Sequence, residues 1–279
     1  MISTKTSKIL CACLAAIGGF SLISPASAGV YSIDDFSITR TRSGTTTTVF
    51  QDNFNNGVAP ASPPYFFTGA VGTESNGRYR FDTATGGIFD STGGPGLVRV
   101  TDARFNPAVT VTNSSLSITD AFTVTGLFDL LTPNIPREGY GIRLGDAGIP
   151  SSNNMNDRLD LFVRRTSTNE LAIQFRDLNS SLDITTTFGS FTLDSNHDQI
   201  LLELSKLDAA TNAITARFAY VDGGIVGAFN TFATTGTLFE GENFTRASFR
   251  ATSPIPLPPT IFLSLIGLAA LVSVRKLKA

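Results

Sequence analysis

The sequence predicts an all-β protein, a two-sheet antiparallel jelly-roll sandwich, with an N-terminal signal helix and one short C-terminal transmembrane helix. Runs in the middle of the chain alternate apolar and polar residues with a period of two, which is typical of half-buried antiparallel strands. Groups of Gly, Asn, Asp and Ser separate these runs and predict turns. Both ends carry apolar segments next to basic residues, which is typical of export and membrane insertion.

The N-terminus, residues 1–28, has the order of a secretory signal peptide. Lys5 and Lys8 precede an apolar stretch at residues 9–23. Ala26 and Ala28 then occupy the two small-residue positions that a signal peptidase recognises. We therefore expect signal peptidase to cleave after Ala28 and the domain to be exported.

Cysteine usage and charge restrict what the exported domain can be. Cys11 and Cys13 both lie in the signal segment, and the apolar stretch follows Cys13, which argues against a lipoprotein. The mature chain therefore has no disulfide, and its core alone must stabilise it. Residues 29–253 contain all 23 acidic residues but only 16 of the 21 lysines and arginines, because five cations lie in the two ends. This acidic balance argues against nucleic acid as a partner.

Residues 29–253 have a length that suits one all-β domain. In one run, Leu159, Leu161 and Val163 are expected to face the core, with charged residues on the opposite face. Turn residues predict hairpins at 167–169 and 222–224, and polar stretches predict surface loops at 59–77 and 145–157. The predicted strands are Ala121–Leu131, Arg158–Arg164, Glu170–Arg176, Gln199–Ser205 and Thr215–Val221.

Part of this pattern is similar to a concanavalin A-like lectin/glucanase domain. The resemblance covers residues 49–250 and implies a fold that binds or cuts glycans on a concave sheet. It is carried by Phe50–Gly57, by the alternation of Phe122, Val124, Gly126 and Phe128, and by Gly139–Leu144.

An enzyme of the glucanase type needs two carboxylates flanking the scissile bond, and E-x-D-x-x-E does not occur in the sequence. Glu203 and Asp208 are five residues apart, so on a strand they would lie on opposite faces. Glu240 and Glu242 share a parity, but the glycine between them favours a turn. We therefore expect no catalytic residues and no cofactor.

His197 is the sole histidine and precedes a predicted strand. It cannot form a zinc site or a Cys-His dyad alone, and the sequence has no G-x-S-x-G motif to supply a triad serine. Asp194, Asn196 and Asp198 are spaced as at the start of a calcium loop, but Gln199 stands where that motif requires glycine. The segment is interpreted as an Asx-rich turn that precedes a strand.

Glycan binding usually uses aromatic rings, and the chain has no tryptophan. Its phenylalanines are assigned to the core, except Phe162, which falls on the polar parity of its strand. Residues 93–96 are Gly-rich but are interpreted as a loop, since no helix and lysine follow. Polar residues at outward positions could line a sugar groove, although an ordinary solvated sheet face is favoured: Asp160, Arg164, Gln174, Arg176 and Arg217.

The C-terminal segment, residues 254–279, joins prolines, an apolar helix and a basic end. The helix, at about residues 260–274, is short for a membrane span, which needs about 20 residues. Arg275, Lys276 and Lys278 follow it and predict a cytoplasmic C-terminus. An uncleaved single-span anchor and a cleavable sorting signal both fit this order.

This segment resembles PEP-CTERM sorting tails, in particular their V-P-L-P-A variety. Ile255 stands for Val, and Pro259 stands for Ala. The Gram-positive L-P-x-T-G signal fits less well because Ile261 replaces its glycine. The resemblance implies recognition by an exosortase-type membrane protease. The sorting-signal residues are Pro256, Leu257, Pro258, Pro259, Arg275, Lys276 and Lys278.

Together these features predict an exported, surface-sorted, non-enzymatic protein of the envelope or of an exopolysaccharide matrix. Its expected partners are signal peptidase, an exosortase-type protease, the membrane through residues 260–274, and exopolysaccharide or a cell-surface glycan. The precursor would be anchored with its domain outside the cytoplasm and then reach the cell surface. Two alternatives stay open: a secreted carbohydrate-active enzyme of the glucanase fold, and a structural protein with an uncleaved membrane anchor.

Overall fold

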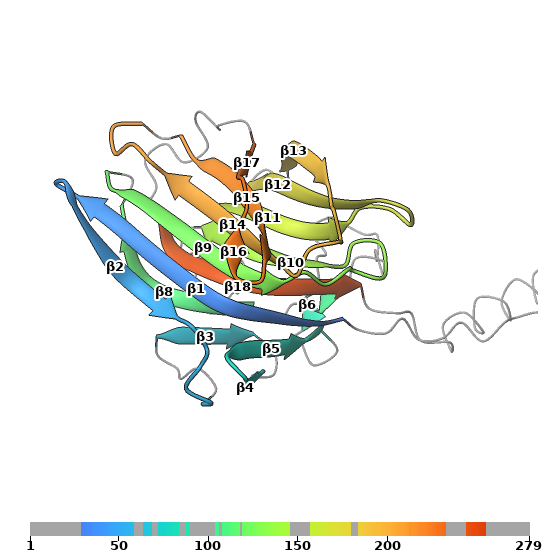
Figure 1. Cartoon of the computed structure of the whole chain (residues 1–279). Helices are drawn as coiled ribbons and strands as arrows, with labels where there is room; N and C mark the ends of the chain where they lie inside the picture. The colour runs from blue at the N-terminus through green and yellow to red at the C-terminus, as the bar shows by residue number, and fades with distance from the viewer. Residues whose placement is uncertain are drawn as a thin grey trace, which may run out of the picture.

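The structure, a computed structural model of the 279-residue chain, consists of β-strands and the turns between them in its described part (Figure 1). The predicted signal peptide (1–28), the segment from 255 onward, the Gly-rich stretch at 93–96 and residues 146–156 lie outside that part. Within it, no helix has the length and apolar character that crossing a membrane requires. The described residues are 29–58, 64–68, 72–83, 88–89, 104–105, 108–117, 119–145, 157–179, 184–211, 213–232 and 244–254.

The first antiparallel sheet, sheet I, contains the N-terminal strand near its middle. β1 (Val30–Arg42) lies between β9 (Ala121–Asp129) and β5 (Arg78–Asp82), and β2 (Thr45–Asp52) pairs with the later part of β1. The sheet continues from β9 through β14 (Gln199–Lys206) and β15 (Thr215–Asp222) to β16 (Ile225–Val226) and β17 (Asn230–Thr231), and ends on the other side at β4 (Thr73–Ser75).

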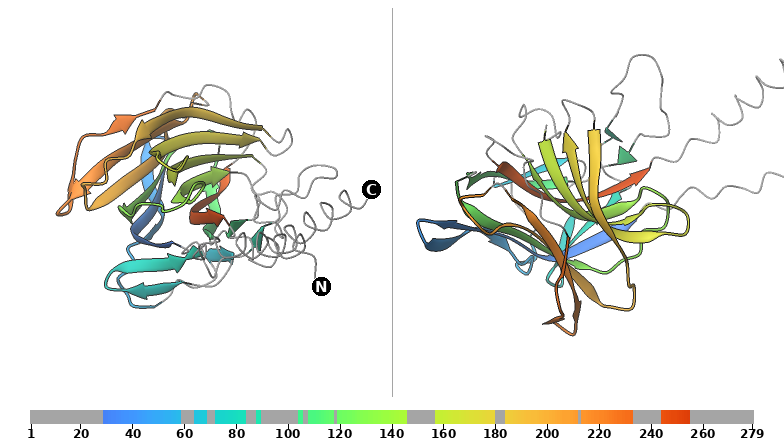
Figure 2. Two further views of the ribbon diagram at one scale, coloured as in Figure 1. Left: turned by 90° about the vertical axis from the view of Figure 1, so that its right-hand side faces the viewer. Right: turned by 90° about the horizontal axis from the view of Figure 1, so that it is seen from above.

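The second antiparallel sheet, sheet II, contains the C-terminal strand near its middle. β18 (Phe244–Pro254) lies between β10 (Gly139–Gly145) and β8 (Ala108–Leu116), and Figure 2 shows the two sheets as separate layers. On the β10 side, the sheet continues through β11 (Asp157–Arg165), β12 (Leu171–Asn179) and β13 (Ile184–Thr192). On the β8 side, it continues to β3 (Tyr65–Thr68). The end of β18 also pairs with β7 (Arg104–Phe105), which pairs with β6 (Ile88–Phe89).

The inner faces of the two sheets form one apolar core. Along β9, buried positions alternate with half-buried ones, as the period-two pattern predicts. Leu159, Leu161 and Val163 of β11 are fully buried, which confirms their predicted orientation. Aromatic rings fill the end near β5, where Phe249 contacts the rings of Tyr79, Phe81, Phe36, Phe54 and Tyr65.

Three hairpins close on two-residue turns in which both residues have positive φ, at 43–44, 76–77 and 223–224. Such turns match the twist of the strands they join. The 223–224 hairpin and the β11–β12 hairpin around 167–169 were predicted, and both form. The prediction of a loop at 59–77 was wrong in part, because β3 and β4 form there as short strands.

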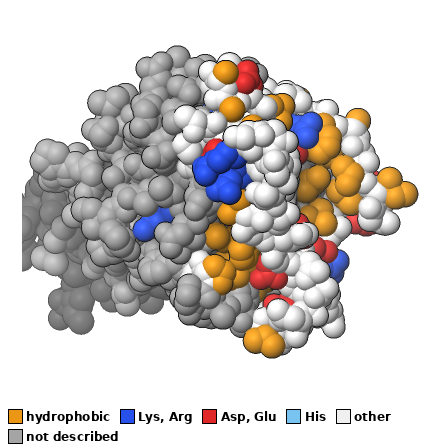
Figure 3. All heavy atoms as spheres, turned by 90° about the vertical axis from the view of Figure 1, so that its left-hand side faces the viewer, with side chains coloured by type: hydrophobic (Ala, Val, Ile, Leu, Met, Phe, Trp, Pro, Cys, Tyr) orange, Lys and Arg blue, Asp and Glu red, His pale blue; other side chains and the backbone are white. Residues whose placement is uncertain are grey.

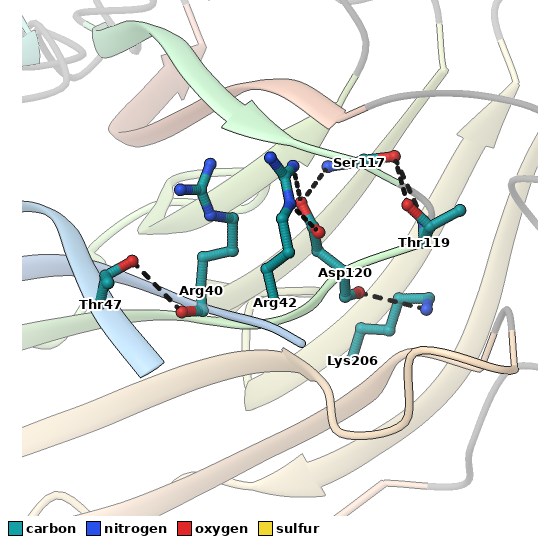
Figure 4. A network of polar contacts seen from close by, with 7 residues as sticks. All are labelled: Arg40, Arg42, Thr47, Ser117, Thr119, Asp120 and Lys206. Carbon is teal, nitrogen blue, oxygen red and sulfur yellow. Dashed lines mark hydrogen bonds and ion pairs between the residues drawn. The ribbon is translucent and has the colours of Figure 1, made fainter. Parts of the chain in front are cut away.

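A polar network closes one end of the core (Figure 4). Arg42 donates from Nε and Nη2 to the Asp120 carboxylate, with both distances 2.7 Å. These hydrogen bonds lower the pKa of Asp120. Lys206 is fully buried, and its Nζ donates to the backbone carbonyls of Asp120, Asp208 and Ala209 at 3.2, 2.9 and 3.0 Å. The sole lysine between 29 and 253 therefore stabilises the loop that follows β14.

Candidate functional site

The outer face of sheet II carries an unusual concentration of arginines. The strand register places Arg143 of β10 beside Asp160 of β11 and Ser248 of β18, so residues of the same parity on these strands share one face. We call this surface the arginine face. It comprises Arg143, Arg158, Asp160, Phe162, Arg164, Gln174, Arg176, Arg246, Ser248 and Arg250.

Asp160 lies at the centre of the arginine face and is fully buried. Arg143 donates to it from Nε and, at 2.7 Å, from Nη2, and Arg176 Nη2 donates to it at 3.0 Å. Burial alone would raise the pKa of this carboxyl, but the two guanidinium groups outweigh burial and lower the pKa to about 2. Asp160 is therefore an ionised counter-charge, already committed to two arginines.

The central strand of this face is nearly free of side chains. Gly139, Gly141 and Gly145 alternate with Arg143 on the same side of β10. A Cβ at Gly141 would lie 2.4 Å from the Phe162 ring, so the glycine makes room for that ring to lie across β10. The Arg176 guanidinium lies 6.0 Å from the centroid of the same ring.

The favoured interpretation of these outward positions, a solvated sheet face, was wrong for Asp160 and Arg164, which are buried, whereas Gln174, Arg176 and Arg217 are half-buried. The exposed fraction is 0% for Asp160, 9% for Arg164 and 3% for Phe162. The pairing of β10, β11, β12 and β18 gathers charged side chains from distant parts of the sequence. Among them, Arg143 and Arg176 donate to Asp160.

Asp160, Arg164, Gln174 and Arg176 come together as the sequence grouped them, but Arg217 does not join them. It lies on β15 in sheet I, where its Nε and Nη2 donate to Glu203 at 2.7 and 3.0 Å. The Arg217 guanidinium also lies 4.1 Å from the centre of the Phe229 ring. Glu203 is thus held in an ion pair, and Asp208 lies beyond the end of β14.

Four members of the face were not predicted from the sequence: Arg143, Arg246, Ser248 and Arg250. Arg143 stands among glycines, which obscure the alternation of β10. The sequence of β18 does carry a period-two pattern, in which Arg246, Ser248 and Arg250 alternate with Ala247 and Phe249, and this pattern predicts one polar and one apolar face.

His197 belongs to a separate cluster at the margin of sheet I. Its ring stacks on Tyr220 with 4.2 Å between centroids, and its Nδ1 lies 2.7 Å from Asp222 Oδ2. This contact lowers the pKa of Asp222. His197, Tyr220 and Asp222, with Ile225, Gly227 and Ala228, line a pocket of about 380 Å³. Among the described residues, no serine hydroxyl bonds to His197, so a triad is not assembled there.

The Asp194 segment forms the expected Asx turn. Asp194 Oδ1 accepts from the backbone N–H of Asn196 at 3.0 Å and from its side-chain amide at 2.7 Å. Asp198 instead accepts from the backbone N–H of Gly223 at 3.1 Å, so the two carboxylates serve different turns. In the described part of the chain, no three His, Cys, Asp or Glu side chains are grouped to hold a metal ion. Glu240 and Glu242 lie outside that part.

Hydrophobic side chains also reach the surface, and Figure 3 shows several gathered along one side of the molecule. The exposed fraction is 76% for Ile225 and 48% for Val226, both in β16. Phe229 is 38% exposed and is covered in part by Arg217. This group is small and lies on sheet I, away from the arginine face.

Comparison with known proteins identifies no family. No family model matches the sequence, and no curated protein matches it. Among solved structures, the chain is similar to the CBM2 module of the evolved Dit of Lactobacillus casei BL23 phage J-1. The two share 13% sequence identity with a TM-score of 0.40, over 80% of this chain and 99% of that chain. A likeness at this level carries no argument about function.

Proposed function

We propose that this chain is an exported, non-enzymatic protein of the cell envelope or of an exopolysaccharide matrix, and that it binds glycan on the arginine face. The observation that carries the proposal is the arginine face itself: six arginines around one carboxylate on a single sheet face. Arginine donates paired N–H groups that match oxygen-rich ligands. A fold that needed only stability would gain as much from apolar packing at these positions.

We further propose that the sheets form a concanavalin A-like jelly roll. Two features support this topology. The chain passes between the sheets repeatedly, as from β9 to β10 and from β13 to β14, and the first and last described strands, β1 and β18, lie inside their sheets. In such a fold the glycan site lies on a broad sheet face, which on this chain would be the outer face of sheet II.

A glycoside hydrolase is the second candidate, and the arginine face disfavours it. Hydrolysis needs two carboxylates about 5 to 10 Å apart. On the described strands of this face, Asp160 is the one carboxylate, and Arg143 and Arg176 already occupy its oxygens. Release of reducing sugar from a panel of β-glucans by the full chain would favour the hydrolase instead.

Glycan binding is tested by presenting the full chain to an array of immobilised neutral and acidic polysaccharides. We expect retention on at least one class, and loss of that retention in the double variant Arg246→Gln/Arg250→Gln. Arg80→Gln is the matched control, because Arg80 is an exposed arginine of β5 outside the face. A chain that is folded but retained on none of the polysaccharides would refute the proposal.

We also propose that residues 254–279 act as a PEP-CTERM-type sorting signal, processed by an exosortase-type protease. The prolines, short apolar segment and basic end support this reading. Intact-mass measurement of the protein from a host with that protease should show loss of residues 261–279. A variant with Pro256, Pro258 and Pro259 changed to Ala should keep them, whereas Pro254→Ala should be processed normally. Retention of residues 261–279 in the unaltered protein would refute this proposal and favour a permanent membrane anchor.

A further inference from the structure

The charges of the arginine face are not balanced within the described residues. On sheet I, arginines pair with carboxylates: Arg42 with Asp120, Arg78 with Asp34 and Asp129, and Arg217 with Glu203. On the arginine face, Asp160 serves both Arg143 and Arg176. Arg246 and Arg250 form no ion pair with any carboxylate in the described part of the chain. Six acids lie outside it: Asp90, Asp102, Asp146, Asp183, Glu240 and Glu242.

These guanidinium groups are also withdrawn from water. Arg250 is 7% exposed and Arg246 is 8% exposed. Within the described residues, the buried Nε of Arg250 and that of Arg176 have no hydrogen-bond partner. A buried charge without a counter-charge, or a buried donor without an acceptor, is unfavourable. An oxyanion that reached these guanidinium groups would supply the acceptor and counter-charge that they lack among the described residues, because it can accept two parallel N–H bonds from one guanidinium.

We propose that the ligand of the arginine face is an acidic polysaccharide, whose sugars carry carboxylate or sulfate groups that pair with Arg246 and Arg250. This inference rests on the proposed glycan-binding function and specifies its ligand class. Arg246 and Arg250 are four residues apart on β18, so their backbones are separated by about 13 Å. That spacing suits successive charged groups on an extended chain better than one small anion.

Two features of the chain favour an acidic glycan over other partners. Neutral sugars bind by stacking on exposed aromatic rings, but Phe162, the aromatic of this face, is 3% exposed and lies beneath Arg176. Nucleic acid would meet repulsion beyond the face, because residues 29–253 carry 23 acidic residues against 16 basic ones. A flexible acidic glycan can place its charged groups on the arginine face alone.

The test is isothermal titration of the full chain with polymers that differ only in charge. Dextran sulfate is compared with dextran, and polygalacturonate with its methyl ester, so that sulfate and carboxylate are tested separately. Polyglutamate serves as an acidic polymer that is not a glycan. We expect at least one charged glycan to bind 100-fold more tightly than its neutral counterpart and more tightly than polyglutamate. Its affinity should fall as salt is raised.

Variants then assign the binding to the face. Arg246→Gln and Arg250→Gln should each weaken binding of the charged polymer about tenfold, which corresponds to about 1.4 kcal/mol. Arg80→Gln, which removes the same charge elsewhere, should change it less than twofold. Near-ultraviolet circular dichroism checks that each variant is folded, and the salt dependence of the unaltered chain gives a result that needs no variant.

The outcomes distinguish failure of this inference from failure of the proposed glycan-binding function. Equal binding of dextran and dextran sulfate, and of polygalacturonate and its ester, would overturn the acidic class but leave glycan binding in place. Equal binding of polyglutamate would overturn the polysaccharide class. Tight binding that folded Arg246 and Arg250 variants retain would overturn the assignment to this face. Binding to none of the glycans would overturn the proposed function as well.

Discussion

Replacing Asp160 by Asn should destabilise the domain more than any other single charge removal on the described strands. The carboxylate is fully buried and accepts three hydrogen bonds from Arg143 and Arg176. Asn keeps one acceptor oxygen but leaves two buried cations without a counter-charge. Breaking a buried ion pair costs about 3 to 5 kcal/mol, and the retained oxygen places Asp160→Asn at the lower end, about 3 kcal/mol.

Thermal and urea unfolding of the full chain, followed by circular dichroism, measure this loss. For a domain of this size, about 3 kcal/mol corresponds to a fall in Tm of about 6 to 12 °C. Glu203→Gln is the matched control. Glu203 likewise accepts two hydrogen bonds from an arginine, Arg217, but the Arg217 side chain is 35% exposed, so the cation that remains is not buried. That change should cost about 1 kcal/mol. If Asp160→Asn costs no more than Glu203→Gln, the central role of Asp160 is refuted.

Three further predictions concern pH, the closed end of the core and the glycine strand. Because the pKa of Asp160 is lowered to about 2 in the folded state, its contribution to the free energy of unfolding should be complete above about pH 4 and lost as the pH falls through 2. Unfolding measured across this pH range should show the stabilities of Asp160→Asn and the unaltered chain converging at the acid end. Lys206→Met removes a buried donor from three backbone carbonyls and should lower stability by about 2 kcal/mol; an unchanged urea midpoint would contradict this. Gly141→Ala places a Cβ against the Leu161 carbonyl oxygen and should lower the free energy of unfolding by about 3 kcal/mol through overpacking. Gly44→Ala is the control: no atom lies within 4 Å of its added Cβ, so only the positive φ should contribute, at about 1 kcal/mol.

Strands with a clean alternation were predictable to within a few residues. The predicted strands at 121–131, 199–205 and 215–221 correspond to β9, β14 and β15. β1 was missed because its alternation is interrupted: a register shift between Ile33 and Asp35 places consecutive acidic residues inside the strand. β10 was not assigned as a strand because Gly139, Gly141 and Gly145 give no periodic signal.

The candidate site was predictable only in part, because long-range pairing builds it. The parity of Asp160 and Arg164 on β11 placed them on one face, and the structure keeps them together. The addition of Arg246 and Arg250 depends on β18 pairing with β10, across a sequence separation of about 100 residues.

The position of β18 determines when the domain can be completed. β18 is the last described strand, yet it pairs with β10 on one side and β8 on the other. Until residues 244–254 have been synthesised, the other described strands of sheet II form three separate parts with exposed edges: β10 to β13, β8 with β3, and β7 with β6. Folding should therefore wait for the whole domain to be synthesised, and a chain that stops just before residue 244 should be a protease-sensitive intermediate instead of a nearly finished sandwich.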